Sequence, residues 1–171
     1  MIIVLVRHAP AEGHGEAEAD AMRQLTDNGR AKMKKAAAGL AVMLAKETDF
    51  CLITSPLIRA VQTAEIVSDY LQLKCFNKDD RLIEGQHEDL IQLIHEHSHE
   101  QVLLLTGHEP WISSFSEFLS RQELPYRKGA AAAFRLEDGW EESGADLLWF
   151  MQPRALRRLS VAHKFIQKDD E

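Results

Sequence analysis

The stretch Ile2-Ile3-Val4-Leu5-Val6-Arg7-His8 decides the fold, because a hydrophobic run ends abruptly in two basic residues. A continuous apolar run rich in β-branched residues predicts a strand that is buried on both faces, as in the middle of a parallel sheet. Ligands of open α/β sheets bind just beyond the carboxyl ends of such strands. Because an unpaired buried charge is costly, Arg7 and His8 predict a bound anion there. A helix-capping arginine and a histidine satisfied in the core are the alternative.

Two further apolar runs repeat this arrangement. Residues 50–54 predict a second buried strand, which is followed by a helix from Pro56 to about residue 71, since proline suits the first position of a helix. Residues 102–106 predict a third buried strand, which ends just before His108 and leads into a helix over 111–120. We therefore expect three strand–turn–helix units in one sheet.

Arg59 falls in the first turn of the helix that follows the second strand. The helix macrodipole is positive at this end, and the free backbone N–H groups point outward, so the position is unfavourable for a cation. An arginine is expected here if an anion binds between it and those amides. Pairing with an acidic side chain elsewhere is the plainer alternative.

The remaining elements are predicted from hydrophobic spacing and from cap and turn residues. Thr26 is the expected N-cap of an amphipathic helix that runs to about residue 46. The other predicted elements are a short edge strand within 74–79, a turn at 81–85, a helix over 88–97, strands at 131–136 and 146–151, and a helix over 155–167. Residues 11–23 are expected to form a mainly solvated acidic loop.

Length, composition and charge bound the protein further. At 171 residues and 45% hydrophobic content, the chain is expected to form a single domain over 1–171. A formal net charge of −7 argues against a nucleic-acid or anionic-membrane surface, so an anion must be held by a local pocket. The first apolar run is too short for a signal peptide or a membrane span, and a cytoplasmic location is expected.

Cysteine and histidine patterns give no metal or disulfide prediction. Cys51 and Cys75 form no disulfide framework in a chain of this size, and no metal-ligand pattern uses them. His95, His97 and His99 alternate, but alternating residues converge on a metal only along a strand. This segment is predicted to be a helix end running into a loop, so a solvated polar cluster is expected.

The three strand ends bring together Arg7, His8, Arg59 and His108 if the strands are neighbours in one parallel sheet. Guanidinium groups match phosphoryl oxygens with paired hydrogen bonds, and helix N-termini add further donors. Two arginines and two histidines at one crevice therefore predict a site for a phosphate dianion.

These motifs resemble those of the histidine phosphatase superfamily, also called phosphoglycerate-mutase-like, and within it the small SixA-type phosphohistidine phosphatases. The stretches that carry the resemblance are 5–9, 23–29, 55–64, 107–110 and 149–153. The resemblance implies a three-layer α/β/α sandwich with a mostly parallel central sheet and helices on both faces. It also implies that His8 is a nucleophile that becomes phosphorylated, and that Arg7, Arg59 and His108 hold the phosphoryl group without a metal or other cofactor.

The general acid and the rim of the site are less sharply defined. The resemblance puts Glu84 at the position of the acid that cleaves alkyl phosphates in this superfamily, with Glu88 and Glu109 behind it; an acid exposed in a turn is the alternative. Thr26 and Ser55 could bind substrate at the rim or serve only as caps. Ala9 replaces the glycine of many members, which counts mainly against a mutase.

Chain length bears on the substrate. His108 follows Glu84 by 24 positions, room for one helix and one strand, whereas members acting on small metabolites carry longer insertions here. An open crevice would admit a phosphorylated side chain of another protein, so a phosphohistidine-bearing protein is the expected substrate. The alternatives are a phosphatase of small phosphate esters such as sugar phosphates, and a non-catalytic phosphate-binding module. Inorganic phosphate or sulfate is expected to bind in each case.

Overall fold

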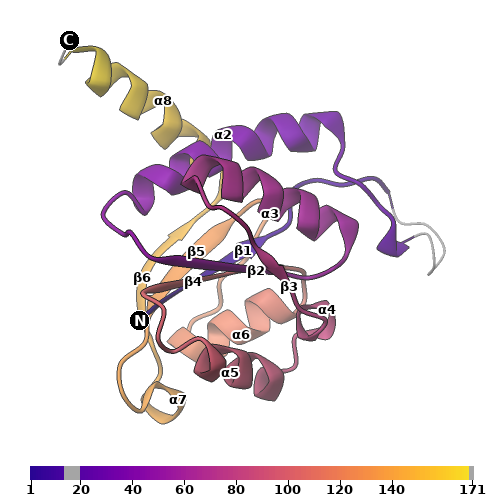
Figure 1. Cartoon of the computed structure of the whole chain (residues 1–171), viewed down its shortest axis with the longest axis vertical. Coiled ribbons are helices and arrows are strands. Elements are labelled where there is room, and N and C mark those ends of the chain that lie inside the picture. The colour runs from indigo at the N-terminus through magenta and orange to yellow at the C-terminus, as the bar shows by residue number, and fades with distance from the viewer. Residues whose placement is uncertain (14–19, 170–171) are drawn as a thin grey trace.

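A computed structural model describes residues 1–13 and 20–169 (Figure 1). Six strands form one sheet in the order β3-β2-β4-β1-β5-β6. The pairs β1–β4, β4–β2 and β2–β3 are parallel, whereas β5 pairs antiparallel with both β1 and β6. The strand bounds are β1 Ile2–Arg7, β2 Phe50–Thr54, β3 Asn77–Lys78, β4 Val102–Gly107, β5 Ala131–Arg135 and β6 Asp146–Met151.

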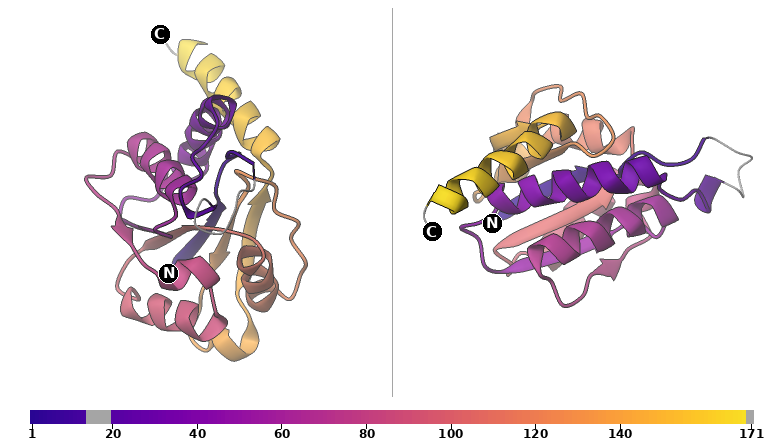
Figure 2. Two further views of the ribbon diagram at one scale, coloured as in Figure 1. Left: turned by 90° about the vertical axis from the view of Figure 1, so that its right-hand side faces the viewer. Right: turned by 90° about the horizontal axis from the view of Figure 1, so that it is seen from above.

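Helices cover both faces of the sheet. One layer holds α2 (Asp27–Met43), α3 (Ile58–Leu71) and α8 (Pro153–Asp169), which lie side by side above the sheet in the right-hand view of Figure 2. The opposite layer holds α4 (Arg81–Glu84), α5 (His87–Glu96) and α6 (Trp111–Ser120), while α7 (Trp140–Ser143) lies between β5 and β6 in the chain. The predicted three-layer α/β/α architecture with a mostly parallel sheet is confirmed.

The alternation of side chains along the central strands explains the two cores. In β1, Ile3 and Leu5 pack with α5 and α6, whereas Val4 and Val6 pack with α2 and α3. Each of these four side chains is completely buried. Because successive side chains of a strand point to opposite faces, a continuous apolar run fits a strand covered on both sides.

Several element boundaries differ from those expected from the sequence. Helix α3 begins at Ile58 rather than Pro56, because Ser55 N–H still donates to the Thr106 carbonyl and Leu57 remains extended. The expected turn at 81–85 contains the short helix α4, and the turn-rich segment before β6 contains α7. The acidic loop predicted over residues 11–23 includes Glu16 and Glu18, which lie outside the described residues.

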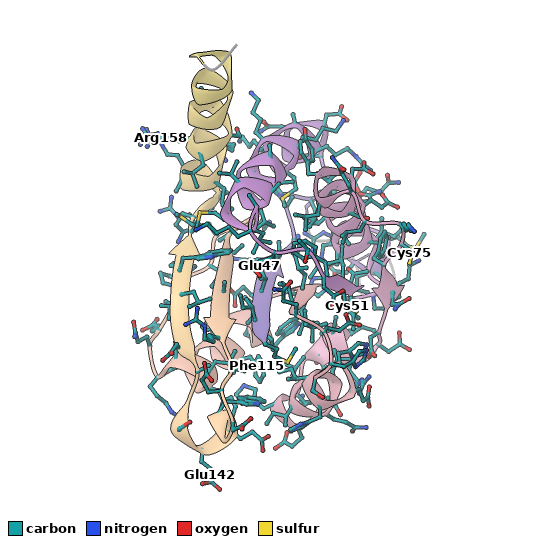
Figure 3. The ribbon with its side chains drawn as sticks, turned by 60° about the vertical axis from the view of Figure 1, so that its left-hand side comes forward. Glu47, Cys51, Cys75, Phe115, Glu142 and Arg158 are labelled. Atoms are coloured by element: carbon teal, nitrogen blue, oxygen red, sulfur yellow. The ribbon has the colours of Figure 1, made fainter. Side chains whose placement is uncertain are left out.

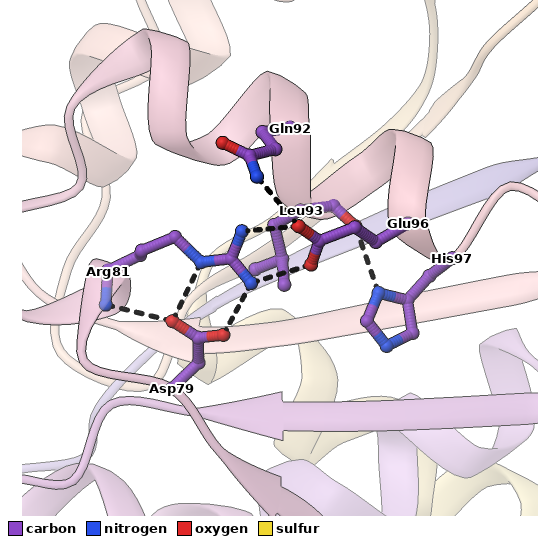
Figure 4. A network of polar contacts seen from close by, with 6 residues as sticks. All are labelled: Asp79, Arg81, Gln92, Leu93, Glu96 and His97. Atoms are coloured by element: carbon purple, nitrogen blue, oxygen red, sulfur yellow. Dashed lines mark hydrogen bonds and ion pairs between the residues drawn. The ribbon is translucent and has the colours of Figure 1, made fainter.

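A network of ion pairs fixes α4 against α5 (Figure 4). The Arg81 guanidinium donates through Nε to Asp79 and through both Nη atoms to Glu96, with a further bond from Nη2 to Asp79. The indole N–H of Trp111, at the start of α6, donates to the Leu82 carbonyl over 3.1 Å. The network therefore links three helices of this layer.

Two other sequence expectations concern the surface. Cys51 is half-buried in β2 and Cys75 is exposed; both are labelled in Figure 3, and both carry free thiols. Among the described residues, no helix is both long and apolar enough to cross a lipid bilayer.

Candidate active site

Sheet register brings the motif residues to one edge. Arg7, the last residue of β1, lies opposite Gly107, the last residue of β4, and Thr54 of β2 lies opposite Thr106. Neighbouring parallel strands that end in register expose the residues that follow them at the same edge. His8 and His108 follow directly, and their rings lie 5.1 Å apart between centroids.

The ring of His8 is held in one orientation. Its Nδ1 lies 2.7 Å from the carbonyl oxygen of Ala9, which can only accept, so Nδ1 carries the proton and donates it. This assignment leaves a lone pair on Nε2. The pKa of His8 is lowered to about 3, chiefly by burial and also by the charges of Arg59 and Arg7, against the raising effect of the Ala9 carbonyl. His8 is therefore neutral at physiological pH and can act as a nucleophile.

His108 is paired with Ser55. Its Nε2 lies 2.9 Å from the Ser55 hydroxyl, and Ser55 follows β2 just as His108 follows β4. The pKa of His108 is lowered to about 3, chiefly by burial and also by the neighbouring His8 and Arg59. A phosphate dianion would favour the protonated ring, so the charge on His108 is coupled to anion binding.

Arg59 is buried at the beginning of α3, as the sequence predicted, and is 7% exposed. Its Nη1 donates to the Asp20 carbonyl over 2.8 Å, and its Nη2 forms an ion pair with the Asp20 carboxylate at 3.2 Å. The same carboxylate lies 2.5 Å from Nη1 of Arg23. Asp20 thus joins two buried arginines, so Arg59 has the acidic partner that the sequence offered as the plainer alternative, and anion binding by Arg59 stays a prediction.

Arg7 is fixed from the opposite side. Its Nη1 donates to the Tyr126 carbonyl over 2.6 Å and lies 3.7 Å from a Glu109 carboxylate oxygen. Burial lowers the pKa of the guanidinium, whereas Glu109 raises it. The side chain is 20% exposed, so it borders solvent while its position is held by the protein.

Hydrogen-bond donors remain unsatisfied at this site. Within the described residues, four buried side-chain polar atoms lack a partner, and three of them are Arg7 Nε, Arg59 Nε and His108 Nδ1. Buried donors are nearly always paired in folded proteins, because an unmade hydrogen bond costs free energy. The charges of Arg59 and Arg7 act on His8, and the His108 ring lies beside it, so two unsatisfied arginine nitrogens and one unpaired imidazole nitrogen belong to neighbours of the nucleophile, a set that suits an oxyanion.

The three carboxylates considered as general acids occupy different places. Glu84 is exposed at the end of α4, and together with Glu88 it lines a recess beside Pro110 and Trp111. Glu109 is held by the Ser113 hydroxyl at 2.8 Å and faces Arg7. Of the three, Glu109 therefore has a direct contact with a predicted phosphoryl-binding residue.

Thr26 acts as a helix cap, whereas α3 has Leu57 as its N-cap and no side-chain cap. Thr26 Oγ1 accepts the Gly29 N–H over 2.9 Å at the start of α2, as predicted. Ser55 Oγ accepts the Leu57 N–H over 3.4 Å, while it also contacts His108. Substrate binding by either hydroxyl stays a prediction.

Two cations near the site were missed by sequence reasoning. Arg23 is 6% exposed and shares Asp20 with Arg59. Burial lowers the pKa of Lys128, as do the positive charges of Arg23, Arg7 and Arg59, so the lysine faces this cluster. Arg23 opens one of the resembling motifs and could have been suspected, whereas Lys128 lies in a connection without any motif.

The alternating histidines have separate local partners. His95 Nε2 lies 2.6 Å from a Glu141 carboxylate oxygen, His97 Nδ1 lies 2.9 Å from the Leu93 carbonyl, and His99 Nε2 lies 3.2 Å from Glu100. In the described part of the chain, no group of three or more His, Cys, Asp or Glu side chains is arranged to hold a metal ion.

Comparisons with known proteins agree with this geometry. The family model of the histidine phosphatase superfamily (branch 1) matches residues 3–131, and the chain belongs to this superfamily. Membership supports phosphatase chemistry. No curated protein sequence matches the chain closely enough to count as a relative.

Solved structures share the fold. A protein histidine phosphatase SixA complexed with tungstate is 24% identical, with a TM-score of 0.75, and the match covers 91% of this chain and 99% of that chain. A putative phosphohistidine phosphatase SixA from Agrobacterium tumefaciens is 21% identical, with a TM-score of 0.73 and coverages of 89% and 97%. An alpha-ribazole phosphatase from Shigella flexneri is 16% identical, with a TM-score of 0.64 and coverages of 90% and 97%. At these identities the likeness concerns the fold.

Proposed function

We propose that the protein hydrolyses phosphohistidine, or another phosphorylated side chain, in proteins through a covalent phospho-His8 intermediate. The observation that carries the proposal is the neutral His8 ring, with its Nδ1 proton held by Ala9, beside the unsatisfied nitrogens of Arg7, Arg59 and His108. The resemblance to SixA-type proteins agrees with this substrate.

In the first step, the Nε2 lone pair of His8 attacks phosphorus, and the bond between phosphorus and the substrate imidazole nitrogen breaks. Both electrons of that bond leave with the imidazole, which takes up a proton. Arg7, Arg59 and protonated His108 stabilise the charge on the equatorial oxygens, and because they are already in place they need little reorganisation. Water then attacks phospho-His8, releases inorganic phosphate and restores the neutral ring.

Hydrolysis of a small phosphate ester is the second candidate, and Glu109 favours it. An alkoxide is a poor leaving group and needs a proton, which Glu109 could supply only after its carboxylate, 3.7 Å from Arg7, had taken one up. A solved alpha-ribazole phosphatase also shares the fold. This reading needs a carboxylic acid at the site, whereas phosphohistidine cleavage depends less on one.

The test is turnover of a phosphohistidine-bearing protein beside a panel of small phosphate esters. We expect the phosphoprotein to be preferred and an acid-labile phosphoryl label to appear on the wild type but not on His8→Ala. The exposed His99→Ala variant is the matched control and should label normally. Strong ester hydrolysis that is lost in Glu109→Gln would instead establish the second candidate, and normal turnover by His8→Ala would rule out both.

A further inference from the structure

A second pocket adjoins the candidate active site. It has a volume of about 420 Å³ and lies between the first half of α2, the connection at 126–129 and the start of α8. Its floor is apolar and includes Met33 and Ala36 of α2, both almost completely buried. Of its lining residues, the reaction proposed above uses only Arg7 and the carbonyl of Ala9.

The lining of this pocket is strongly basic. It includes five cationic side chains, those of Arg7, Lys32, Arg127, Lys128 and Arg157, and none of its described lining residues is acidic. The chain as a whole carries a net charge of −7, so this concentration runs against the overall charge. Across residues 1–13 and 20–169, none of the last four side chains forms an ion pair. Like charges held together repel one another and favour an anionic occupant.

The pocket is fixed relative to His8. Arg7 belongs to both places, and Ala9, whose carbonyl orients the His8 ring, also lines the pocket. The Gly129 N–H donates to the carbonyls of Arg7 and His8, at 3.1 Å each, so the connection that carries Arg127 and Lys128 is tied to the end of β1. An anion in the pocket would therefore lie at a set distance from the phosphoryl group.

The apolar floor and cationic rim together indicate the shape of the occupant. An aspartate or glutamate side chain has an apolar stem that fits against Met33 and Ala36 and a carboxylate that can pair with the rim. Lys32 and Arg127 are exposed, so the rim reaches the outer surface where a passing polypeptide can meet it. Resting on the proposed function, we propose that this pocket binds an acidic side chain of the substrate protein close to its phosphorylated residue.

The test compares two phosphohistidine peptides that differ only beside the phosphorylated residue, one with Asp and Glu there and the other with Asn and Gln. The ratio of their kcat/KM values is measured for the wild type, for Lys32→Ala/Arg127→Ala, and for the control Lys34→Ala/Arg158→Ala. The control removes the same charge from exposed positions outside the pocket, since Lys34 is exposed on α2 and Arg158 projects outward from α8 (Figure 3).

We expect the wild type and the control to prefer the acidic peptide by about fivefold, the effect of two partly exposed ion pairs. The double variant should bring the ratio close to one, and because each ratio is internal to one variant, a general loss of activity cancels. Hydrolysis of both peptides by the wild type without preference would overturn the inference and leave the proposed function standing. A preference that survives in the double variant would overturn it equally.

A small-molecule arm separates the two possible sources of a carboxylate. In this arm the same ratio of kcat/KM values is measured for a phosphate ester that carries a carboxylate and for its amide. If the wild type hydrolyses neither peptide, both the proposed function and this inference fail. A preference that appears only in this arm and is lost in the double variant would overturn the protein substrate and assign the pocket to a small acid.

Discussion

Two sets of arginines in this protein have opposite surroundings. Arg81 uses all three of its guanidinium nitrogens on the carboxylates of Asp79 and Glu96, and these hydrogen bonds raise its pKa (Figure 4). Arg7 and Arg59 form fewer hydrogen bonds, each keeps a buried Nε without a partner in the described residues, and burial lowers the pKa of both. All the guanidinium nitrogens of Arg81 are hydrogen-bonded to protein groups, whereas Arg7 and Arg59 each keep one that is not.

We propose that this difference separates a structural role from a phosphoryl-binding role. A saturated guanidinium stabilises the fold and has little left to offer a ligand. An arginine that is positioned by the protein but not saturated can form two further hydrogen bonds when an oxyanion arrives, and it need not reorganise to do so. Two predictions test this comparison directly, and one between them tests the charge states of the two histidines beside Arg7 and Arg59.

The largest effect is expected on catalysis. Arg59→Ala should lower kcat/KM by about 10²- to 10³-fold, the usual cost of removing one donor to a developing oxyanion. Steady-state kinetics on a phosphohistidine peptide would measure it. Arg81→Ala is the matched control and should stay within about threefold of the wild type, because its partners lie away from His8. Equal losses in the two variants would refute the distinction between the two sets.

Acid should destabilise the protein through the buried histidines. The pKa of His8 and that of His108 are lowered to about 3 in the folded state, against about 6.5 in the unfolded chain. The unfolded state therefore binds more protons than the folded state between these pH values. The free energy of unfolding is undiminished by these two histidines above pH 6.5, and it declines as the pH falls toward 3. At pH 5 each histidine should account for roughly 2 kcal/mol of this decline.

Urea unfolding of the wild type and of His8→Asn at pH 7 and pH 5 measures this contribution. The variant should lose less free energy between the two values, because one of the two groups is gone. His99→Asn, which removes a histidine whose side chain is 72% exposed, should behave like the wild type. A wild type that is equally stable at both pH values would contradict the proposed charge states.

The smallest effect is expected on stability from the saturated arginine. Arg81→Ala should lower the free energy of unfolding by roughly 1 kcal/mol, since its ion pairs are partly exposed to solvent. In a chain of this size, this corresponds to a fall in Tm of roughly 2–4 °C. Thermal unfolding followed by circular dichroism would measure it. An unchanged Tm would show that the network in Figure 4 does not stabilise α4.

Much of the fold could be predicted because its signals are local. Patterns of neighbouring residues were enough to predict the strands β1, β2 and β4, the Thr26 cap and the helix at 111–120. The start of α3 was placed two residues early, because the proline rule does not include the hydrogen bond from Ser55 to Thr106. That bond depends on a strand about 50 positions away, so no local pattern reports it.

The candidate site could be predicted only in part, because some of its residues have a local sequence signal and others are placed by contacts between distant segments. Arg7, His8, Arg59 and His108 stand out because each follows a buried strand or opens a helix, and motifs shared with a family add to that signal. The sharing of Asp20 by Arg59 and Arg23 depends on a contact between Asp20 and the first turn of α3, 39 positions away in the chain. The position of Lys128 depends on a connection anchored to the end of β1. Neither follows from residue spacing.

The sequence alone determined the central strands, the helices that flank them and the identity of the basic residues at the strand ends, because hydrophobic alternation and capping act over a few residues. The tertiary structure decided which carboxylate faces Arg7, which nitrogens stay unsatisfied and where the basic pocket lies. These features arise from the order of the strands in the sheet and from contacts between distant segments. Such contacts depend on packing in three dimensions, which no short stretch of sequence encodes.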